Sequence, residues 1–179
     1  MRRHANSGDP QSRLKRLADE IENLAKKDEI ALARAREILD LRRMAAFELH
    51  AICAEFVKSV NQLLSGPIVR LDPCELNPEG FHPDGINLFQ IHVQGRILQA
   101  EFRPTGELVS TEDFRVPYTL EGTVRAFNQA LLDKDLIEEQ LLFYTLEKER
   151  KMWRFFDART YRTGPFDIEY LITLMEEIV

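Results

Sequence analysis

The chain has 179 residues, and 44% of them are hydrophobic, which is enough for the core of one domain of ordinary size and excludes disorder throughout. The formal net charge of −6 is unevenly distributed: residues 1–65 have 12 lysines and arginines against 10 acids, whereas residues 66–179 have 12 against 20. An acidic body repels a phosphate backbone, so this charge argues against nucleic acid as a partner.

The amino-terminal residues contain no apolar run of the kind that a signal peptide needs, and no segment approaches the ~18 apolar residues of a membrane helix. The chain has two cysteines, Cys53 and Cys74, and so few in a chain of this length indicate reduced thiols rather than a disulfide framework. We therefore expect a cytoplasmic protein that makes no contact with a membrane.

The longest predicted element covers residues 11–65, which contain neither glycine nor proline and are rich in strong helix formers. Apolar residues recur there at alternating steps of three and four, a heptad pattern that is interrupted at Asp28 and Arg42. Such spacing is typical of a coiled-coil helix. The alternative is a helical hairpin that bends at residues 25–29, with Asp28 capping the second helix.

The two halves of this helical segment differ in the width of their apolar stripe. Residues 38–65 add Phe47, Val57 and Val60 to the heptad positions, so we expect them to pack on the rest of the domain. The thinner stripe before them consists of Leu14, Leu17, Ile21 and Leu24. Exposed apolar stripes drive self-association, so these residues predict a dimer or partner interface, with packing inside the same chain as the alternative.

A β-sheet is predicted after Gly66 and Pro67, which end the helix. Residues 67–71 predict a short strand, and a long loop rich in proline and glycine follows. Residues 89–102 predict a hairpin, because apolar and polar residues alternate on both sides of a two-residue turn. With the turn at Gln94 and Gly95, Val93 pairs with Arg96, and one face of the hairpin consists of Phe89, Ile91, Val93, Leu98, Ala100 and Phe102.

The remaining elements are predicted from turn residues and spacing. Residues 104–107 predict a second turn, and residues 108–116 predict a weaker strand. Thr119 is a candidate N-cap for a helix whose apolar positions are Leu120, Val124, Phe127 and Leu131.

Two aromatic-rich segments, residues 141–147 and 151–157, predict a second hairpin. A continuous helix from Leu136 onward is the alternative. A final helix begins after Asp167, with Phe166 positioned to pack on Leu171.

These elements predict an α+β fold in the order α-β-β-β-(β)-α-β-β-α: a long coiled-coil-like helix, and an antiparallel meander and hairpin that form one sheet packed by helices. The expected organisation is a flexible N-terminus over residues 1–10, a long helix or helical hairpin over residues 11–65, and an α+β domain over residues 66–179 packed on residues 38–65. The order resembles that of the class I chaperones of type III secretion, which are small, acidic and dimeric, although the extended first helix departs from theirs. The resemblance implies a dimeric chaperone-like protein.

No catalytic motif is assembled in the sequence. Cys74, His82 and His92 are residue types that ligate zinc, but their spacing is not one of the compact paired patterns. None of the glycines forms a phosphate-binding loop before a helix. We therefore predict no catalytic residues, no metal and no cofactor.

The polar face of the first predicted hairpin is a candidate ligand-binding surface. It consists of Gln90, His92, Gln99, Glu101 and Arg103. The simpler interpretation is a hydrated sheet face. A concave pocket over these residues would favour ligand binding.

The sequence therefore predicts a non-enzymatic protein-interaction protein, a bacterial-type cytoplasmic adaptor or chaperone-like protein that acts as a dimer and binds itself or another protein. One alternative is a small-molecule-binding protein or enzyme that uses the polar sheet face around His92. A second alternative is a weak nucleic-acid binder that uses the N-terminal helix, where residues 13–16 form a basic segment.

Overall fold

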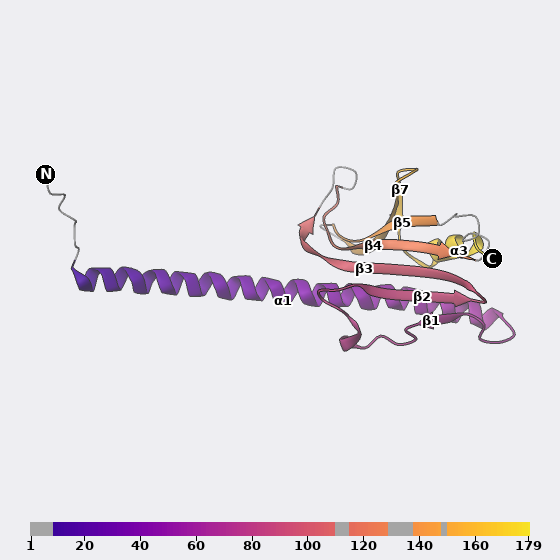
Figure 1. Cartoon of the computed structure of the whole chain (residues 1–179), viewed down its shortest axis with the longest axis horizontal. Coiled ribbons are helices and arrows are strands. Elements are labelled where there is room, and N and C mark those ends of the chain that lie inside the picture. Colours follow the sequence, from indigo (N-terminus) through magenta and orange to yellow (C-terminus); the bar gives the residue numbers. More distant parts are fainter. Residues whose placement is uncertain (1–8, 110–114, 129–137, 148–149) are drawn as a thin grey trace. The chain divides into compact units, whose positions relative to one another are not determined.

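The computed structural model describes residues 9–109, 115–128, 138–147 and 150–179, with the backbone alone for residues 107–109 and 138. In chain order its elements are α1 (Pro10–Leu63), β1 (Arg70–Asp72), the short 3-10 helix η1 (Pro78–Gly80), β2 (Asn87–Val93), β3 (Arg96–Val109), β4 (Tyr118–Phe127), β5 (Glu138–Leu146), β6 (Lys151–Asp157), β7 (Arg162–Pro165) and α3 (Ile168–Glu176) (Figure 1). The predicted α+β class and order of elements are confirmed, although β7 was not predicted.

The chain divides into two compact units, residues 1–40 and residues 41–179, and α1 contributes to both. α1 is a single helix of 54 residues that passes through residues 25–29 without a break. The alternative of a helical hairpin is therefore wrong. None of the described helices combines the length and apolar character that a membrane crossing requires.

The sheet has seven strands in the order β1-β2-β3-β4-β5-β6-β7, and every neighbouring pair is antiparallel. Each strand therefore pairs with the strand before it in the chain, as in a meander. Only β1 and β7 have a free edge among the described strands, and both are short, which limits pairing with other chains.

The β2–β3 hairpin has the predicted register. Val93 pairs with Arg96, and Gln90 pairs with Gln99. Gln94 has φ 43° and Gly95 has φ 87°, so both turn residues are left-handed, as a type I′ turn requires. Of the six residues predicted to form the apolar face, five are buried and Val93 is half-buried.

β3 is longer than predicted, and the turn expected at residues 104–107 is wrong. Pro104 still pairs with Leu120, the pairing then shifts, and the strand continues to Val109. Thr105 Oγ1 donates to the carbonyl of Thr119 at 3.2 Å, so a bulge accommodates the proline without ending the strand. Of the weaker strand expected at residues 108–116, residues 108–109 are in a strand, as the end of β3, and residues 115–116 are not. Residues 110–114 lie outside the described part.

The helix expected from Thr119 to Leu131 is wrong over residues 119–127, which belong to β4. Leu120 and Val124 are four residues apart, and this separation places two side chains on one face of a helix and also on one face of a strand. Both side chains are buried in the core. Leu131 lies outside the described residues.

The second predicted hairpin is formed by β5 and β6, where Leu141 pairs with Phe156 and Tyr144 with Trp153. The alternative of a continuous helix from Leu136 is wrong over the described residues. The C-terminal helix begins as predicted, because the Asp167 side chain caps α3 by accepting from the backbone N–H of Tyr170 at 3.0 Å.

The core lies on one face of the sheet, between the sheet and the helices. Trp153 Nε1 donates to the carbonyl of Ala45 on α1 at 2.7 Å. Two residues along the same strand, the Phe155 ring stacks on Tyr170 of α3 with a centroid distance of 4.0 Å. Alternate residues of a strand share a face, so α1 and α3 cover the same side. The side chains of α1 buried there are Ala45, Ala46, Leu49, His50, Cys53 and Phe56.

Candidate functional site

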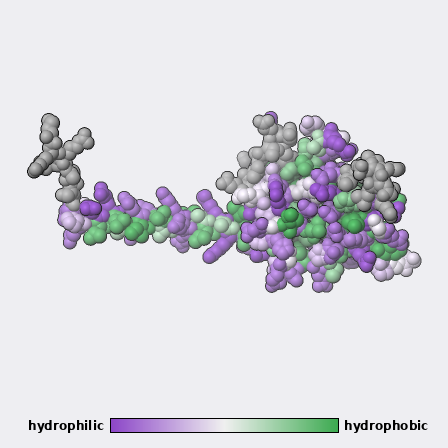
Figure 2. Space-filling view, in the orientation of Figure 1, coloured by the Kyte–Doolittle hydropathy of each residue, from purple (hydrophilic) through white to green (hydrophobic). Residues whose placement is uncertain are grey.

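An apolar stripe on residues 10–40 of α1 is the first candidate site. The four residues predicted as an interface, Leu14, Leu17, Ile21 and Leu24, have exposed fractions of 64%, 51%, 58% and 59%. Figure 2 shows hydrophobic side chains following one another along this part of the helix, with hydrophilic ones between them. Side chains of this kind are normally removed from water, so the stripe favours association with a further surface.

The heptad pattern explains why the stripe has one apolar and one charged border. In the usual notation, residues 14, 21, 28 and 35 occupy a positions and residues 17, 24, 31 and 38 occupy d positions. The e positions are apolar: Ala18, Ala25 and Leu32. The g positions are charged: Arg13, Glu20, Lys27 and Arg34.

The same heptad pattern serves a different purpose from Arg42 onward. The Arg42 guanidinium, at the next a position, donates from Nε to Thr119 Oγ1 at 2.8 Å and from Nη2 to the carbonyl of Thr105 at 2.5 Å. Desolvation lowers the pKa of Arg42, and Asp84 partly opposes this change. From Ala45 to Phe56 the heptad positions are buried or half-buried, so the exposed stripe of residues 10–40 ends before Arg42.

A hollow on the opposite face of the sheet from α1 and α3, here the outer face, is the second candidate site. It has a volume of about 390 Å³. Its charged and aromatic lining includes Glu101, Arg103, Tyr118, Glu121, Arg125 and Phe143.

A bulge in β4 supplies the aromatic floor of this hollow. Simple alternation would place Tyr118 on the same face as Leu120, but the β4–β5 register shifts between these two residues. Tyr118 therefore reaches the outer face, where its ring lies 4.5 Å from the ring of Phe143. With Phe156, these residues form a small buried apolar cluster apart from the main core.

Both arginines that line the hollow are ion-paired. Arg103 forms an ion pair with Glu121 at 3.1 Å, and Arg125 forms one with Glu139 at 2.5 Å. Desolvation raises the pKa of Tyr118, and Glu121 raises it further, so the phenol stays protonated well above neutral pH. This arrangement suits recognition of a polar group over an aromatic surface better than it suits acid–base chemistry.

The five predicted ligand-binding residues are divided by the structure. Glu101 and Arg103 line the hollow. Gln90 donates to Gln99 at 2.8 Å, and Gln99 is 3.4 Å from Glu101, so these three side chains form one polar row across β2 and β3. His92 lies in another row of that face, where it pairs with Ile97.

Sequence reasoning missed the aromatic floor and the β4 side of the hollow. Glu121 lies in the segment expected to be helical, and Tyr118 lies directly before it. The alternation of polar and apolar residues from Thr119 to Ala126 is typical of a strand, but no sequence pattern predicts the bulge.

Among the described residues, the sulfur and imidazole groups mark no further site. Burial raises the pKa of the Cys53 thiol to about 12, so it remains protonated, and Cys74 is an exposed free thiol. Within the part of the chain that the structure describes, no three metal-ligating side chains converge.

Comparison of the chain with protein-family models, curated proteins and solved structures finds no match.

Proposed function

We propose that the protein is a non-enzymatic adaptor or chaperone-like protein of the cytoplasm, which acts as a dimer through residues 10–40 of α1. The observation that supports this function is the exposure of Leu14, Leu17, Ile21 and Leu24 along one side of the helix. Complete burial of a leucine or isoleucine side chain contributes ~1.5–3 kcal/mol of stabilisation. Burial of these four residues in each of two copies therefore supplies a substantial driving force for association.

The helix itself also favours a partner for this segment. An isolated helix in water is marginally stable, because most helical stability in proteins comes from packing of its apolar face. In residues 10–40 the described side chains are exposed, apart from half-buried Leu39. Association with a second copy would supply the packing that stabilises the helix, and it would present two sheet domains to a further protein.

The oligomeric state of the full chain tests this proposal. Light scattering should give twice the mass of one chain, and the double variant Leu17→Glu/Ile21→Glu should give the mass of one chain. A control, Lys15→Gln/Lys26→Gln, changes the net charge equally at polar heptad positions outside the stripe and should remain dimeric. A monomeric wild-type chain would contradict the proposed function.

Small-molecule binding is the second candidate function, and the hollow of about 390 Å³ on the outer sheet face favours it. Its size and its mixture of aromatic and charged side chains suit a small organic molecule with one charged group. A thermal-shift screen of small amines and carboxylic acids tests this function. A stabilising compound should lose its effect in Phe143→Ala or Glu101→Gln, whereas an unchanged effect in both variants would exclude the hollow as its site.

A further inference from the structure

We infer that residues 10–40 of two copies pair in an antiparallel direction, with Leu17 of one copy opposite Ala35 of the other. The inference depends on the proposed dimer and specifies its geometry. Side-chain size, the two borders of the stripe and the a position of Asp28 favour this geometry.

Side-chain size changes along the stripe. The first four heptad positions hold large residues, Leu14, Leu17, Ile21 and Leu24, whereas the next three hold small or short ones, Asp28, Ala31 and Ala35. A parallel pair in register would place large residues against large ones and alanine against alanine. Because the distance between two packed helices depends on the residues at the contact, these layers would require different distances.

The antiparallel pair matches large residues with small or short ones in every layer except the two outermost ones. The layers would be Leu14 with Ile38, Leu17 with Ala35, Ile21 with Ala31, and Leu24 with Asp28, each occurring twice. The six inner layers then fill a similar volume, which allows one spacing between the helices over their length. The two outermost layers pair Leu14 with Ile38 at the ends of the paired segment.

The borders of the stripe also favour the antiparallel direction. In a parallel coiled coil each g position faces an e position of the other helix, so Glu20 would face Ala25 and Lys27 would face Leu32. In an antiparallel pair g positions face g positions and e positions face e positions. Glu20 then lies near Arg34 of the other copy twice, and the apolar e residues cover each other on the opposite border.

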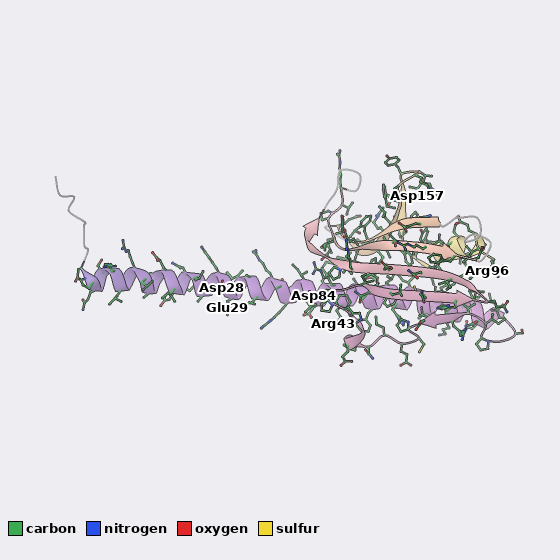
Figure 3. All side chains as sticks on the ribbon, viewed as in Figure 1. Asp28, Glu29, Arg43, Asp84, Arg96 and Asp157 are labelled. Atoms are coloured by element: carbon green, nitrogen blue, oxygen red, sulfur yellow. The ribbon has the colours of Figure 1, made fainter. Side chains whose placement is uncertain are left out.

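Asp28 supplies the third argument, since it occupies an a position in the middle of the stripe (Figure 3). A parallel pair would bring the two Asp28 carboxylates together in the seam, where like charges repel. The antiparallel pair separates them and places each beside the Lys27 side chains at the centre, which reduces the repulsion between those two lysines.

Other antiparallel registers are less complementary. If Leu14 lay opposite Ala31, Arg13 would come close to Arg34 of the other copy. If Ile21 lay opposite Ile38, Leu14 and Leu17 would have no partner layer. The register with Leu17 opposite Ala35 also ends at Ile38, just before Arg42 is engaged by the sheet domain.

Disulfide trapping in the full chain tests the direction. In a Cys74→Ser background, which removes the exposed thiol, the double variant Leu17→Cys/Ala35→Cys is mildly oxidised and its cross-linked peptides are mapped by mass spectrometry. Peptides that join residue 17 to residue 35 between chains are expected. Leu17→Cys alone and Ala35→Cys alone should give little covalent dimer.

Charge reversal provides an independent measurement. Glu20→Arg and Arg34→Glu should each weaken dimerisation about tenfold, since two attractive pairs become repulsive, and the combined variant should return to within about twofold of wild type. Peptides that join residue 17 to residue 17, or charge variants without effect in an intact dimer, would overturn the antiparallel direction while leaving the proposed dimer standing. A monomeric wild-type chain would overturn both.

Discussion

Gly122 is a residue at which the sheet leaves no room for a side chain. A Cβ atom at this position would lie 1.9 Å from the carbonyl oxygen of Glu101 and 2.7 Å from the Cα of Phe102, both of them backbone atoms of β3. Gly122→Ala therefore requires β3 and β4 to separate, and we expect it to lower the free energy of unfolding by about 3 kcal/mol. Urea denaturation measures this change.

Gly106→Ala is the matched control for Gly122→Ala. A Cβ atom at Gly106 meets nothing within 4 Å. The unfolding free energy of this control should lie within about 0.5 kcal/mol of the wild type. Equal effects of the two variants would contradict the close approach of β3 and β4.

Asp157 stabilises the turn between β6 and β7 in its ionised form. Its carboxylate accepts from the backbone N–H of Arg159 at 2.9 Å and from the Thr160 hydroxyl at 2.8 Å, and these bonds hold its pKa below the ordinary value of 3.8. Figure 3 shows where this residue lies in the sheet domain. A lowered pKa stabilises the fold above the ordinary value, and this contribution disappears as the pH falls through the lowered value.

We therefore expect Asp157→Asn to lower the melting temperature at pH 7. The difference in melting temperature between the variant and the wild type should become smaller as the pH is reduced below 3.8. Thermal melts at several pH values measure this. A difference that stays constant with pH would show that the carboxylate charge has no role.

At the scale of elements, the β2–β3 hairpin depends on two left-handed residues in its turn. Gly95 has φ 87°, where an alanine is strained, so Gly95→Ala should cost about 1–2 kcal/mol. Gln94, with φ 43°, is a residue type that seldom adopts this conformation, and Gln94→Asn should raise stability by a few tenths of a kcal/mol to about 1 kcal/mol. In urea denaturation we expect Gly95→Ala to lower the free energy of unfolding and Gln94→Asn to raise it. Two destabilising changes would contradict a type I′ turn.

This hairpin was predictable because local pattern and local structure agree. Strict alternation on both sides of Gln94 and Gly95 permits one register, since a slip of one residue would expose the apolar face. The capped start of α3 at Asp167 was predictable for a similar reason, because an N-cap depends on neighbouring residues alone.

β4 was not predictable in the same way. Leu120 and Val124 fit both the helical and the strand period, and the outcome depends on pairing with β3, which is a contact between distant parts of the sequence. The aromatic floor of the hollow could not be predicted for a related reason. Tyr118 reaches the outer face through a bulge, and a bulge is a property of two paired strands that one strand's sequence does not reveal.

At the scale of the whole molecule, α1 uses one heptad pattern in two environments. Between Ala45 and Phe56 its a and d positions are buried or half-buried, whereas Leu14, Leu17, Ile21 and Leu24 are exposed. The proposed dimer gives the exposed part the same kind of environment as the buried part. The stability of residues 10–40 should therefore depend on protein concentration.

Hydrogen exchange of the backbone amides in residues 10–40, measured over a range of protein concentrations, tests this claim most directly. The proposed dimer predicts that exchange slows as the concentration rises, and that Leu17→Glu/Ile21→Glu removes this slowing while leaving the amides of β2 to β6 protected. Exchange in residues 10–40 that is independent of concentration and unchanged in the double variant would contradict dimerisation through this helix.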